Sequence, residues 1–423
     1  MSTRLSQDRP LVAVVGAGFA GLAALRVLRK APVQVVLIDR NNYHLFQPLL
    51  YQVASSMLDD AEVARPLRGM LHKFPNVDFR MATVQSIHLD ARRLRTEHGE
   101  LVFDYAILCA GSTTNFFGNR SAEQRGYGLK DLDEALRLRC RILQQFEAAR
   151  WTDDPERRRE LLSFVVVGGG PTGIECAGAL IELINSVLKK DFRGMDLSQV
   201  EVMLVEGSEH LLAPFSGHLQ HIGHWQLSRK GVKVRFNSIV QEVREGEVML
   251  RDGTVLRAGT VIWTAGVKAN RIPGIPHEVL GRGGAIKVEP TLQLHGHPHV
   301  YVAGDMAAIQ AGDGVLPMVA QVAMQGAECA ARNIIAAIKG SPQQPFRYHD
   351  KGMMATIGRY SAVVQTKRMK IHGFAGWLAW LFLHLLYLAS FRSKVITLVD
   401  WGWDYLLQDR PVRLIVGGDV PPD

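Results

Sequence analysis

Runs of apolar residues recur along the chain, and two of them open the same order of predicted elements. The first run, 11–15, precedes a glycine-rich turn, a helical stretch and a second apolar run, 33–39, that ends in an acid. The runs 164–167 and 200–206 repeat this order later in the chain. Buried parallel strands read as continuous apolar runs, so each set predicts a strand–helix–strand unit of a doubly wound sheet.

The repeat extends beyond these two units. The apolar runs 105–108 and 261–263 follow their glycine turns at a comparable distance, and each ends in small residues. We therefore expect a whole α/β domain to be duplicated. A last strand, 300–302, leads through a glycine loop to Pro317, which we expect at the first position of a helix ending near Lys339. The helix after the second glycine turn is expected to run on towards Lys189.

Composition narrows the class of protein. The 423 residues are 47% hydrophobic and 21% charged, as in globular proteins of two or three domains. The N-terminus is polar and lacks an apolar signal core, so a cytoplasmic location is expected. No pair of the four cysteines has metal-site or redox spacing, so neither a metal site nor a local disulfide is predicted. These cysteines are Cys109, Cys140, Cys176 and Cys329.

The first glycine turn has the spacing of a dinucleotide site. Gly16, Gly18 and Gly21 lie between a predicted strand and a helix, and Asp39 ends the next strand. Glycines let the backbone approach a pyrophosphate, the helix N-terminus offers free N–H groups, and the acid binds ribose hydroxyls. The same predicted site includes Ala17, Phe19, Ala20, Arg40, Ala110 and Gly111.

The second glycine turn follows the same logic. Gly168, Gly170 and Gly173 are followed by Glu206, and an acid there favours NADH over NADPH because a 2′-phosphate would face like charge. Glu175 is placed in the first helical turn, either complementing the helix dipole or acting in catalysis. The same predicted site includes Gly169, Pro171, Thr172, Ala265 and Gly266.

Two dinucleotide sites on one chain predict two dinucleotides, most simply a permanently held FAD and an exchangeable NADH. Asp305, after Gly304, is placed to bind the ribityl chain of FAD. The helix from near Pro317 would then direct its positive end at the flavin ring. Gln321 and Gln325 are four residues apart, so they share one face of this helix.

The C-terminal part of the chain has the composition of a membrane anchor. Residues 371–391 contain no Asp, Glu, Lys or Arg. Four tryptophans lie in or soon after this stretch, Trp377, Trp380, Trp401 and Trp403, and tryptophan favours the headgroup level of a bilayer. Trp401 and Trp403 belong to a second, shorter amphipathic piece. Between residues 346 and 394, eight Lys or Arg stand against one acid. We expect a peripheral anchor on an anionic lipid surface, in preference to a membrane span or a nucleic-acid site.

Four further sequence runs resemble those of the type II NADH dehydrogenases (NADH:quinone oxidoreductases), which are two-dinucleotide-binding-domain flavoproteins. They are YHLFQPLLYQV at 43–53, WTAGV at 263–267, AQVAMQ at 320–325 and KGMMATIGR at 351–359. The resemblance covers nearly the whole chain.

The resemblance implies a respiratory enzyme that passes a hydride from NADH to FAD and two electrons to a membrane quinone, ubiquinone or menaquinone. Because the sequence predicts no bundle of polar transmembrane helices, we expect no proton pumping. The resemblance further implies that Gln321 and Gln325 bind the quinone or the flavin edge, that Gln47 and Pro48 lie near the isoalloxazine, and that Lys351 lies near the quinone. Glu175 is a candidate proton relay.

The resemblance also implies a location and an assembly. These are the cytoplasmic face of a bacterial inner membrane and a homodimer. The expected domains are FAD-binding (1–118 and 286–345), NADH-binding (119–285) and membrane-associating (346–423). Alternatives are a sulfide:quinone or other quinone-linked flavoprotein reductase, and a redox-sensing flavoprotein that acts through partners.

Overall fold

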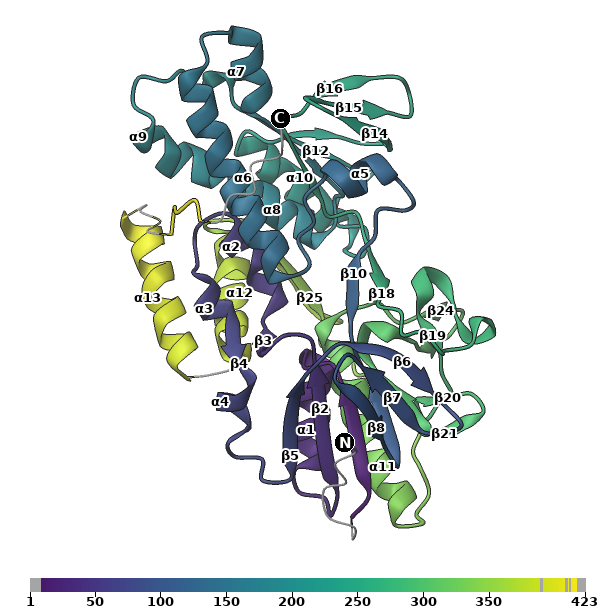
Figure 1. The fold of residues 1–423 in the computed structure, drawn as a ribbon. Coiled ribbons are helices and arrows are strands. Elements are labelled where there is room, and N and C mark those ends of the chain that lie inside the picture. Colours follow the sequence, from purple (N-terminus) through teal and green to yellow (C-terminus); the bar gives the residue numbers. More distant parts are fainter. Residues whose placement is uncertain (1–8, 389–390, 408–409, 411, 417–423) are drawn as a thin grey trace. The chain divides into compact units, whose positions relative to one another are not determined.

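The computed structural model describes residues 9–388, 391–407, 410 and 412–416. Its contacts divide the chain into two compact units, each built from separate segments (Figure 1). Unit 1 comprises the residues up to Leu45, Arg65–Thr113 and Val267–Asp350. Unit 2 comprises Phe46–Ala64, Thr114–Gly266 and the residues from Lys351 on. The predicted domains are defined by ligands rather than by contacts, so they stay a prediction.

A six-stranded sheet in the order β20-β21-β9-β1-β2-β5 forms the centre of unit 1. Neighbouring strands pair in parallel, except for β20 and β21. A three-stranded antiparallel sheet, β6-β7-β8, is inserted before β9. The main elements of unit 1 are β1 (Leu11–Val15), α1 (Phe19–Leu28), β2 (Gln34–Asp39), α4 (Leu67–Leu71), β5 (Val77–Met81), β6 (Val84–His88), β7 (Arg93–Thr96), β8 (Gly99–Val102), β9 (Tyr105–Leu108), β20 (Gln293–Leu294), β21 (His297–Val302) and α11 (Ala320–Ile338).

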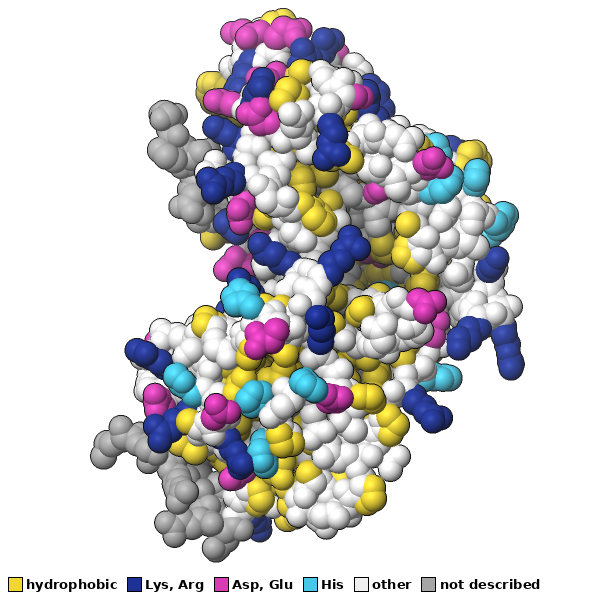
Figure 2. Space-filling view, turned by 90° about the vertical axis from the view of Figure 1, so that its right-hand side faces the viewer, with side chains coloured by type: hydrophobic (Ala, Val, Ile, Leu, Met, Phe, Trp, Pro, Cys, Tyr) yellow, Lys and Arg dark blue, Asp and Glu magenta, His cyan; other side chains and the backbone are white. Residues whose placement is uncertain are grey.

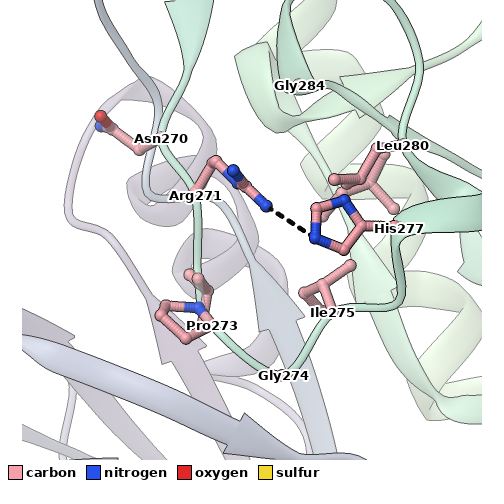
Figure 3. A pocket seen from close by; sticks show the side chains of 10 residues that line it. Asn270, Arg271, Pro273, Gly274, Ile275, His277, Leu280 and Gly284 are labelled. Carbon is pink, nitrogen blue, oxygen red and sulfur yellow. Dashed lines mark hydrogen bonds between the residues drawn. The ribbon is translucent and has the colours of Figure 1, made fainter.

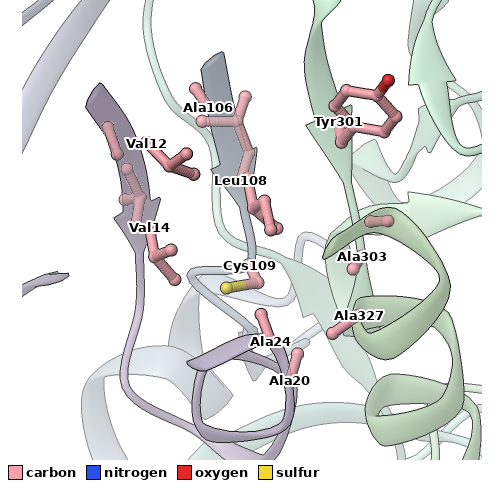
Figure 4. Close-up of a cluster of buried hydrophobic side chains, with 14 of the residues drawn as sticks. Val12, Val14, Ala20, Ala24, Ala106, Leu108, Cys109, Tyr301, Ala303 and Ala327 are labelled. Atoms are coloured by element: carbon pink, nitrogen blue, oxygen red, sulfur yellow. The ribbon is translucent and has the colours of Figure 1, made fainter. Parts of the chain in front are cut away.

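Small side chains let two helices of unit 1 lie close together. Helices α1 and α11 pack against each other. Figure 4 shows Ala20 and Ala24 of α1 beside Ala327 of α11, next to the buried strands β1, β9 and β21. Because alanine side chains are small, the two helices can approach each other closely beside these strands.

Unit 2 repeats this design. Its parallel sheet has the order β13-β12-β11-β17, and the antiparallel sheet β14-β15-β16 is inserted before β17. The predicted duplication of a whole domain is therefore confirmed. The repeated elements are β11 (Ser163–Val167), α8 (Pro171–Leu183), β12 (Glu201–Val205), α10 (Gly217–Arg229), β13 (Lys233–Arg235), β14 (Val240–Arg244), β15 (Glu247–Leu250), β16 (Val255–Arg257) and β17 (Thr260–Trp263).

Further elements of unit 2 pack around this sheet. Helix α8 continues through a π-helical turn (Ile184–Leu188) into α9 (Lys189–Asp191), as its length predicted. It packs on β25 of the antiparallel sheet β25-β26-β27. The other elements of unit 2 include the short helices Gln47–Leu49 and Leu197–Gln199, α2 (Leu50–Ala54), α3 (Asp60–Val63), α5 (Arg120–Arg125), α6 (Leu132–Trp151), α7 (Pro155–Leu161), β25 (Met353–Gly358), β26 (Ser361–Gln365), β27 (Lys370–His372), α12 (Gly373–Tyr387) and α13 (Phe391–Leu407).

Helices α12 and α13 each have a buried and an exposed apolar face. Trp377, Trp380 and Trp401 face inward and are 6%, 1% and 2% exposed. The prediction that the tryptophans sit at the headgroup level is thus wrong for these three, because their rings fill the core of unit 2; Trp403 is exposed. The exposed face, which we call the outer apolar face, consists of Phe374, Leu378, Phe382, Leu386, Phe391, Val395, Leu398, Val399, Trp403, Leu406 and Leu407.

Hydrogen bonds hold α13 and the residues that follow it on the rest of unit 2. The Trp401 indole N–H donates to Gln52 Oε1 at 2.8 Å, and the buried Arg410 guanidinium donates to Asp404 at 3.0 Å and to the Ser55 carbonyl at 2.8 Å. Among the described residues, no helix combines the length and the apolar character that crossing a membrane requires. The second amphipathic piece predicted from the sequence corresponds to α13. It has 17 residues against 15 in α12, so the prediction that it is the shorter of the two is wrong.

Charged side chains surround these cores. On the face drawn in Figure 2, Lys and Arg side chains are interspersed with Asp and Glu on the parts of the chain that are described. Next to the outer apolar face in sequence, Lys367, Arg368, Lys370 and Arg392 are exposed.

Candidate functional site

The three glycines of the first turn have different structural roles. A Cβ at Gly16, whose φ is 109°, would lie 2.3 Å from the Cys109 carbonyl oxygen, and a Cβ at Gly21 would lie 1.9 Å from the Gly16 oxygen. A Cβ at Gly18 would meet nothing within 4 Å. Gly16 and Gly21 are therefore required by packing, whereas Gly18 borders open space, as a backbone that admits a ligand must.

The second turn reproduces this pattern. A Cβ at Gly168, with φ 110°, would lie 2.6 Å from the Ala265 Cα, and one at Gly173 would lie 1.9 Å from the Gly168 oxygen. Gly170 again borders open space. Helices α1 and α8 begin directly after Gly18 and Gly170, and neither has a side-chain cap among the described residues. Each turn thus presents backbone N–H groups suited to an anionic phosphate.

The two acids reach back to their own glycine turns. Asp39 accepts hydrogen bonds from the Ala17 N–H at 2.6 Å and the Asn41 N–H at 2.8 Å. Glu206 accepts from the Gly169 N–H at 2.6 Å and from the Ser208 N–H at 2.8 Å. Burial raises the pKa of Asp39, although the Asn41 and Ala17 N–H groups oppose this. The acids fix the turns beside which a ribose is expected to bind.

Unit 1 also brings the later predicted FAD residues to this edge of its sheet. Ser112, directly after Gly111, donates a hydrogen bond to Asp305. A Cβ at Gly304 would lie 3.2 Å from the Ala20 Cβ, which places this turn against α1. Asn270 donates to the Ala110 carbonyl at 2.8 Å. Sequence reasoning missed the roles of Ser112 and Asn270, because their hydrogen-bond partners, Asp305 and Ala110, lie far away along the chain.

The two glutamines lie on α11 as predicted, but the helix begins later than expected. It starts at Ala320 after the N-cap Val319, so Pro317 is not its first residue. Gln321 is half-buried in the first turn. The Gln325 amide pairs with the backbone of His349, donating to its oxygen and accepting from its N–H, both at 3.0 Å. In this structure Gln325 holds the 346–350 segment on α11.

Gln47 and Lys351 belong to unit 2, whereas the two glutamines of α11 belong to unit 1. Gln47 Oε1 accepts a hydrogen bond from Lys130 Nζ at 3.3 Å, and Pro48 follows it in the same short helix. The Lys351 side chain is exposed.

Glu175 is a buried carboxyl in unit 2. It lies in the second turn of α8, so the predicted first-turn position is wrong, and dipole complementation does not explain it. It accepts a hydrogen bond from the Thr356 N–H at 3.2 Å. Burial raises its pKa to about 8, against opposing effects from Thr356 and Trp380. The group therefore carries its proton over most of the neutral range.

A buried polar chain lies in the same unit. The Gln52 amide donates to the Tyr51 hydroxyl at 2.9 Å and accepts from Trp401. Tyr51 packs edge-on against Trp380 with a centroid distance of 6.4 Å. Burial raises the Tyr51 pKa well above 10, and the Glu175 charge adds to the shift.

A cavity of about 300 Å³ lies in unit 1, with Asn270 among its lining residues (Figure 3). Its Arg271 and His277 side chains point toward each other, with nitrogens 3.4 Å apart. None of the predicted site residues lines it, so we assign neither dinucleotide to it. The lining residues are Asn270, Arg271, Ile272, Pro273, Gly274, Ile275, His277, Leu280, Gly284 and Ile286.

All four cysteines lie in the described part of the chain and are free thiols. Three of them are buried. Burial raises the pKa of Cys176 to about 12, with a smaller effect from Glu175, so this thiol is unreactive at neutral pH.

Known proteins resemble this chain in sequence and in fold. The model of the pyridine nucleotide-disulphide oxidoreductase family matches residues 10–327. The type II NADH:quinone oxidoreductase Ndh of Mycobacterium tuberculosis is 39% identical over 95% of this chain and 89% of its own length. The type II NADH:quinone oxidoreductase of Staphylococcus aureus is 31% identical over 85% of this chain and 90% of its own length.

Solved structures share the fold. NDH2 of Plasmodium falciparum, in complex with NADH, has a TM-score of 0.87 at 19% identity and covers 96% of this chain and 99% of its own. The sulfide:quinone oxidoreductase of Aquifex aeolicus has a TM-score of 0.74 at 19% identity, over 95% of this chain and 96% of its own. Given the extent and identity of the sequence matches, the chain belongs to the pyridine nucleotide-disulphide oxidoreductase family and, within it, to the type II NADH:quinone oxidoreductases.

Proposed function

We propose that this protein is an FAD-dependent NADH:quinone oxidoreductase of the respiratory chain that does not pump protons. The observation that carries the proposal is the pair of glycine turns, one in each unit, each with an open glycine, an uncapped helix start and an acid. Bound FAD supplies the redox chemistry, accepting a hydride and releasing electrons to a second substrate.

Unit 1 is the proposed FAD site. The space beside Gly18 and the N–H groups of α1 suit a pyrophosphate, and Asp39 is placed for the adenosine ribose. Asp305 lies at the same edge, where its carboxylate can bind a ribityl hydroxyl. The N-terminus of α11 adds a positive dipole end that stabilises negative charge beside it.

Unit 2 is the proposed NADH site. The open Gly170 and the start of α8 suit the second pyrophosphate. The Glu206 carboxylate beside this turn accepts ribose hydroxyls and repels a 2′-phosphate, which supports NADH over NADPH. A kcat/KM for NADPH equal to that for NADH would contradict this assignment.

The quinone is proposed to bind near Gln321 and Gln325 of α11, which the family resemblance supports. Glu175 is the proposed proton relay, because a buried carboxyl with a pKa of about 8 can both hold and release a proton near neutrality. A Glu175→Gln variant is expected to lose quinone turnover at least tenfold while flavin reduction by NADH continues. Unchanged turnover would remove Glu175 from the reaction.

Anaerobic reduction tests the whole proposal. NADH is expected to bleach the flavin absorption of the purified protein, and a soluble quinone is expected to restore it. Bleaching by sulfide but not by NADH would indicate a sulfide:quinone reductase instead. Bleaching by NADH without reoxidation by quinone would indicate a redox sensor.

The outer apolar face is proposed to lie on the cytoplasmic surface of the membrane as a peripheral anchor. Its support is the exposed apolar row on α12 and α13 with exposed cations nearby. A Phe382→Ser, Leu386→Ser variant is expected to lose sedimentation with anionic lipid vesicles, whereas Trp225→Ser, which removes an exposed aromatic residue of α10, is not. Equal sedimentation of the two variants would contradict the anchor.

A homodimer is also proposed, on the family resemblance alone. Light scattering of the detergent-solubilised enzyme measures the mass directly, and the mass of a single chain would contradict the dimer.

A further inference from the structure

Phe117 is an exposed aromatic residue in a backbone conformation that bulky residues avoid. Its φ is 53° and its side chain is 64% exposed. The next residue, Gly118, is also left-handed, with φ 78°. A bulky residue persists in this region only when its surroundings fix it, and such residues concentrate at functional sites.

The end of strand β17 fixes this conformation. Trp263 donates its indole N–H to the Asn115 carbonyl at 2.9 Å, and the Asn115 N–H donates to the Gly266 carbonyl at 3.0 Å. The Asn115 side chain then accepts the Phe117 N–H at 2.9 Å. Phe117 is therefore held in place through Asn115 by the turn that follows β17.

The Phe117 ring lies on Gly266. A Cβ at Gly266 would be 2.8 Å from the ring Cζ and 3.3 Å from Cε2, and its three nearest atoms all belong to this ring. The φ of Gly266 is not in the left-handed region, so its backbone would accept an ordinary residue. The lack of a side chain at 266 is thus explained by the ring above it.

This ring stands at the ligand edge of the unit 2 sheet. Strands β11 and β17 pair in parallel, so they end at the same edge, and Ala265 packs against Gly168 of the second glycine turn. Ligands of doubly wound sheets bind at this edge. With a pyrophosphate at Gly170, a dinucleotide extended along the edge would bring its nicotinamide end past Ala265 to the ring on Gly266.

We propose that Phe117 is a substrate-positioning residue whose ring packs against the nicotinamide ring of bound NADH. The proposal rests on the proposed function, since it takes unit 2 as the NADH site. An exposed aromatic ring that is fixed by strained backbone offers a rigid apolar surface for a flat heterocycle. Phe117 has no proton to exchange, so its role is to orient the nicotinamide.

Two ligands that differ only at the nicotinamide test this contact. NAD⁺ and ADP-ribose share the adenosine and the pyrophosphate, and only NAD⁺ carries the nicotinamide. By calorimetry on the FAD-loaded protein, Phe117→Ala is expected to raise the Kd of NAD⁺ about tenfold and to leave that of ADP-ribose unchanged. Phe117→Tyr, which keeps the ring, is expected to retain the wild-type Kd values.

Matched variants separate this role from a structural one. Trp151→Ala removes another exposed aromatic residue of unit 2, 87% exposed at the end of α6, and should change neither Kd. Gly266→Ala is expected to weaken NAD⁺ binding in the wild-type background, where it displaces the ring, but to have no further effect with Phe117→Ala. Flavin absorption and Tm of each variant report that the protein is folded and loaded.

The outcomes also distinguish this inference from the proposed function. A wild-type protein that binds neither NAD⁺ nor ADP-ribose would overturn both. A wild-type protein that binds both ligands, with Phe117→Ala changing neither Kd or both equally, would overturn the role of Phe117 and leave the proposed function standing.

Discussion

Replacing Glu175 with Gln is expected to change how the stability of this protein depends on pH. The ordinary pKa of a glutamate is 4.5, and burial raises that of Glu175 to about 8. In the unfolded chain the carboxyl therefore ionises from pH 4.5 upward, whereas in the folded protein it keeps its proton until about pH 8. The wild-type protein thus loses stability as the pH rises through this window.

The size of the loss follows from the shift. Each pKa unit corresponds to about 1.4 kcal/mol, so a shift of this size amounts to about 4–5 kcal/mol once the pH exceeds 8. Glutamine cannot ionise, and its side-chain carbonyl can still accept the hydrogen bond from the Thr356 N–H. The Glu175→Gln variant should match the wild type near pH 5 and exceed it in stability by up to about 4–5 kcal/mol near pH 9.

Thermal unfolding of the FAD-loaded proteins, followed by scanning calorimetry at a fixed scan rate, measures this difference. The Tm of Glu175→Gln minus that of the wild type should rise between pH 5 and pH 8 and level off at higher pH. Glu147→Gln is the control, because it makes the same replacement at an exposed position on α6 of the same unit. A Glu175→Gln difference that is independent of pH would refute the buried, protonated carboxyl.

Three further changes test other parts of the structure. Gly18→Ala should leave the Tm of the FAD-free protein unchanged yet raise the FAD Kd at least tenfold in equilibrium dialysis. Gly21→Ala, whose methyl would lie 1.9 Å from a backbone oxygen, should destabilise the fold by about 3 kcal/mol or more in urea unfolding. Arg410→Ala leaves the buried Asp404 carboxylate unpaired and should lower the free energy of unfolding by about 3–5 kcal/mol at pH 7; a loss below about 1 kcal/mol would contradict the pair. Trp401→Phe removes the hydrogen-bond donor to Gln52 and should lower the free energy of unfolding by about 1 kcal/mol in the same urea assay. An unchanged free energy would argue against that hydrogen bond.

Sequence reasoning succeeded where local rules decide the structure. The order strand, glycine turn, helix, strand, acid is set within a few dozen residues, and both copies fold as predicted. The glycines themselves were treated alike, whereas in the structure packing requires Gly16 and Gly21 and only Gly18 borders open space.

Sequence reasoning failed where distant segments decide. Glu175 is not in the first turn of α8 but one turn later, where β25 covers it, and β25 lies far along the chain. Trp380 and Trp401 were assigned to a lipid headgroup region, yet they fill the core of unit 2 because α2 supplies Tyr51 and Gln52 beneath them. The residue type of these tryptophans indicated a position at a boundary, but it did not indicate whether the ring would face the lipid or the protein core.

The interleaving of the two units constrains how the protein can form. Unit 2 needs Phe46–Ala64 from near the start of the chain and the residues from Lys351 on, while unit 1 is completed only by Val267–Asp350. On the ribosome, neither unit can close until most of the chain has emerged, and the early segment must wait for its late partners. A contiguous fragment would lack part of either unit and should therefore be prone to aggregation. Likewise, a nonsense mutation even late in the gene would remove the segments that cover α2 and α8.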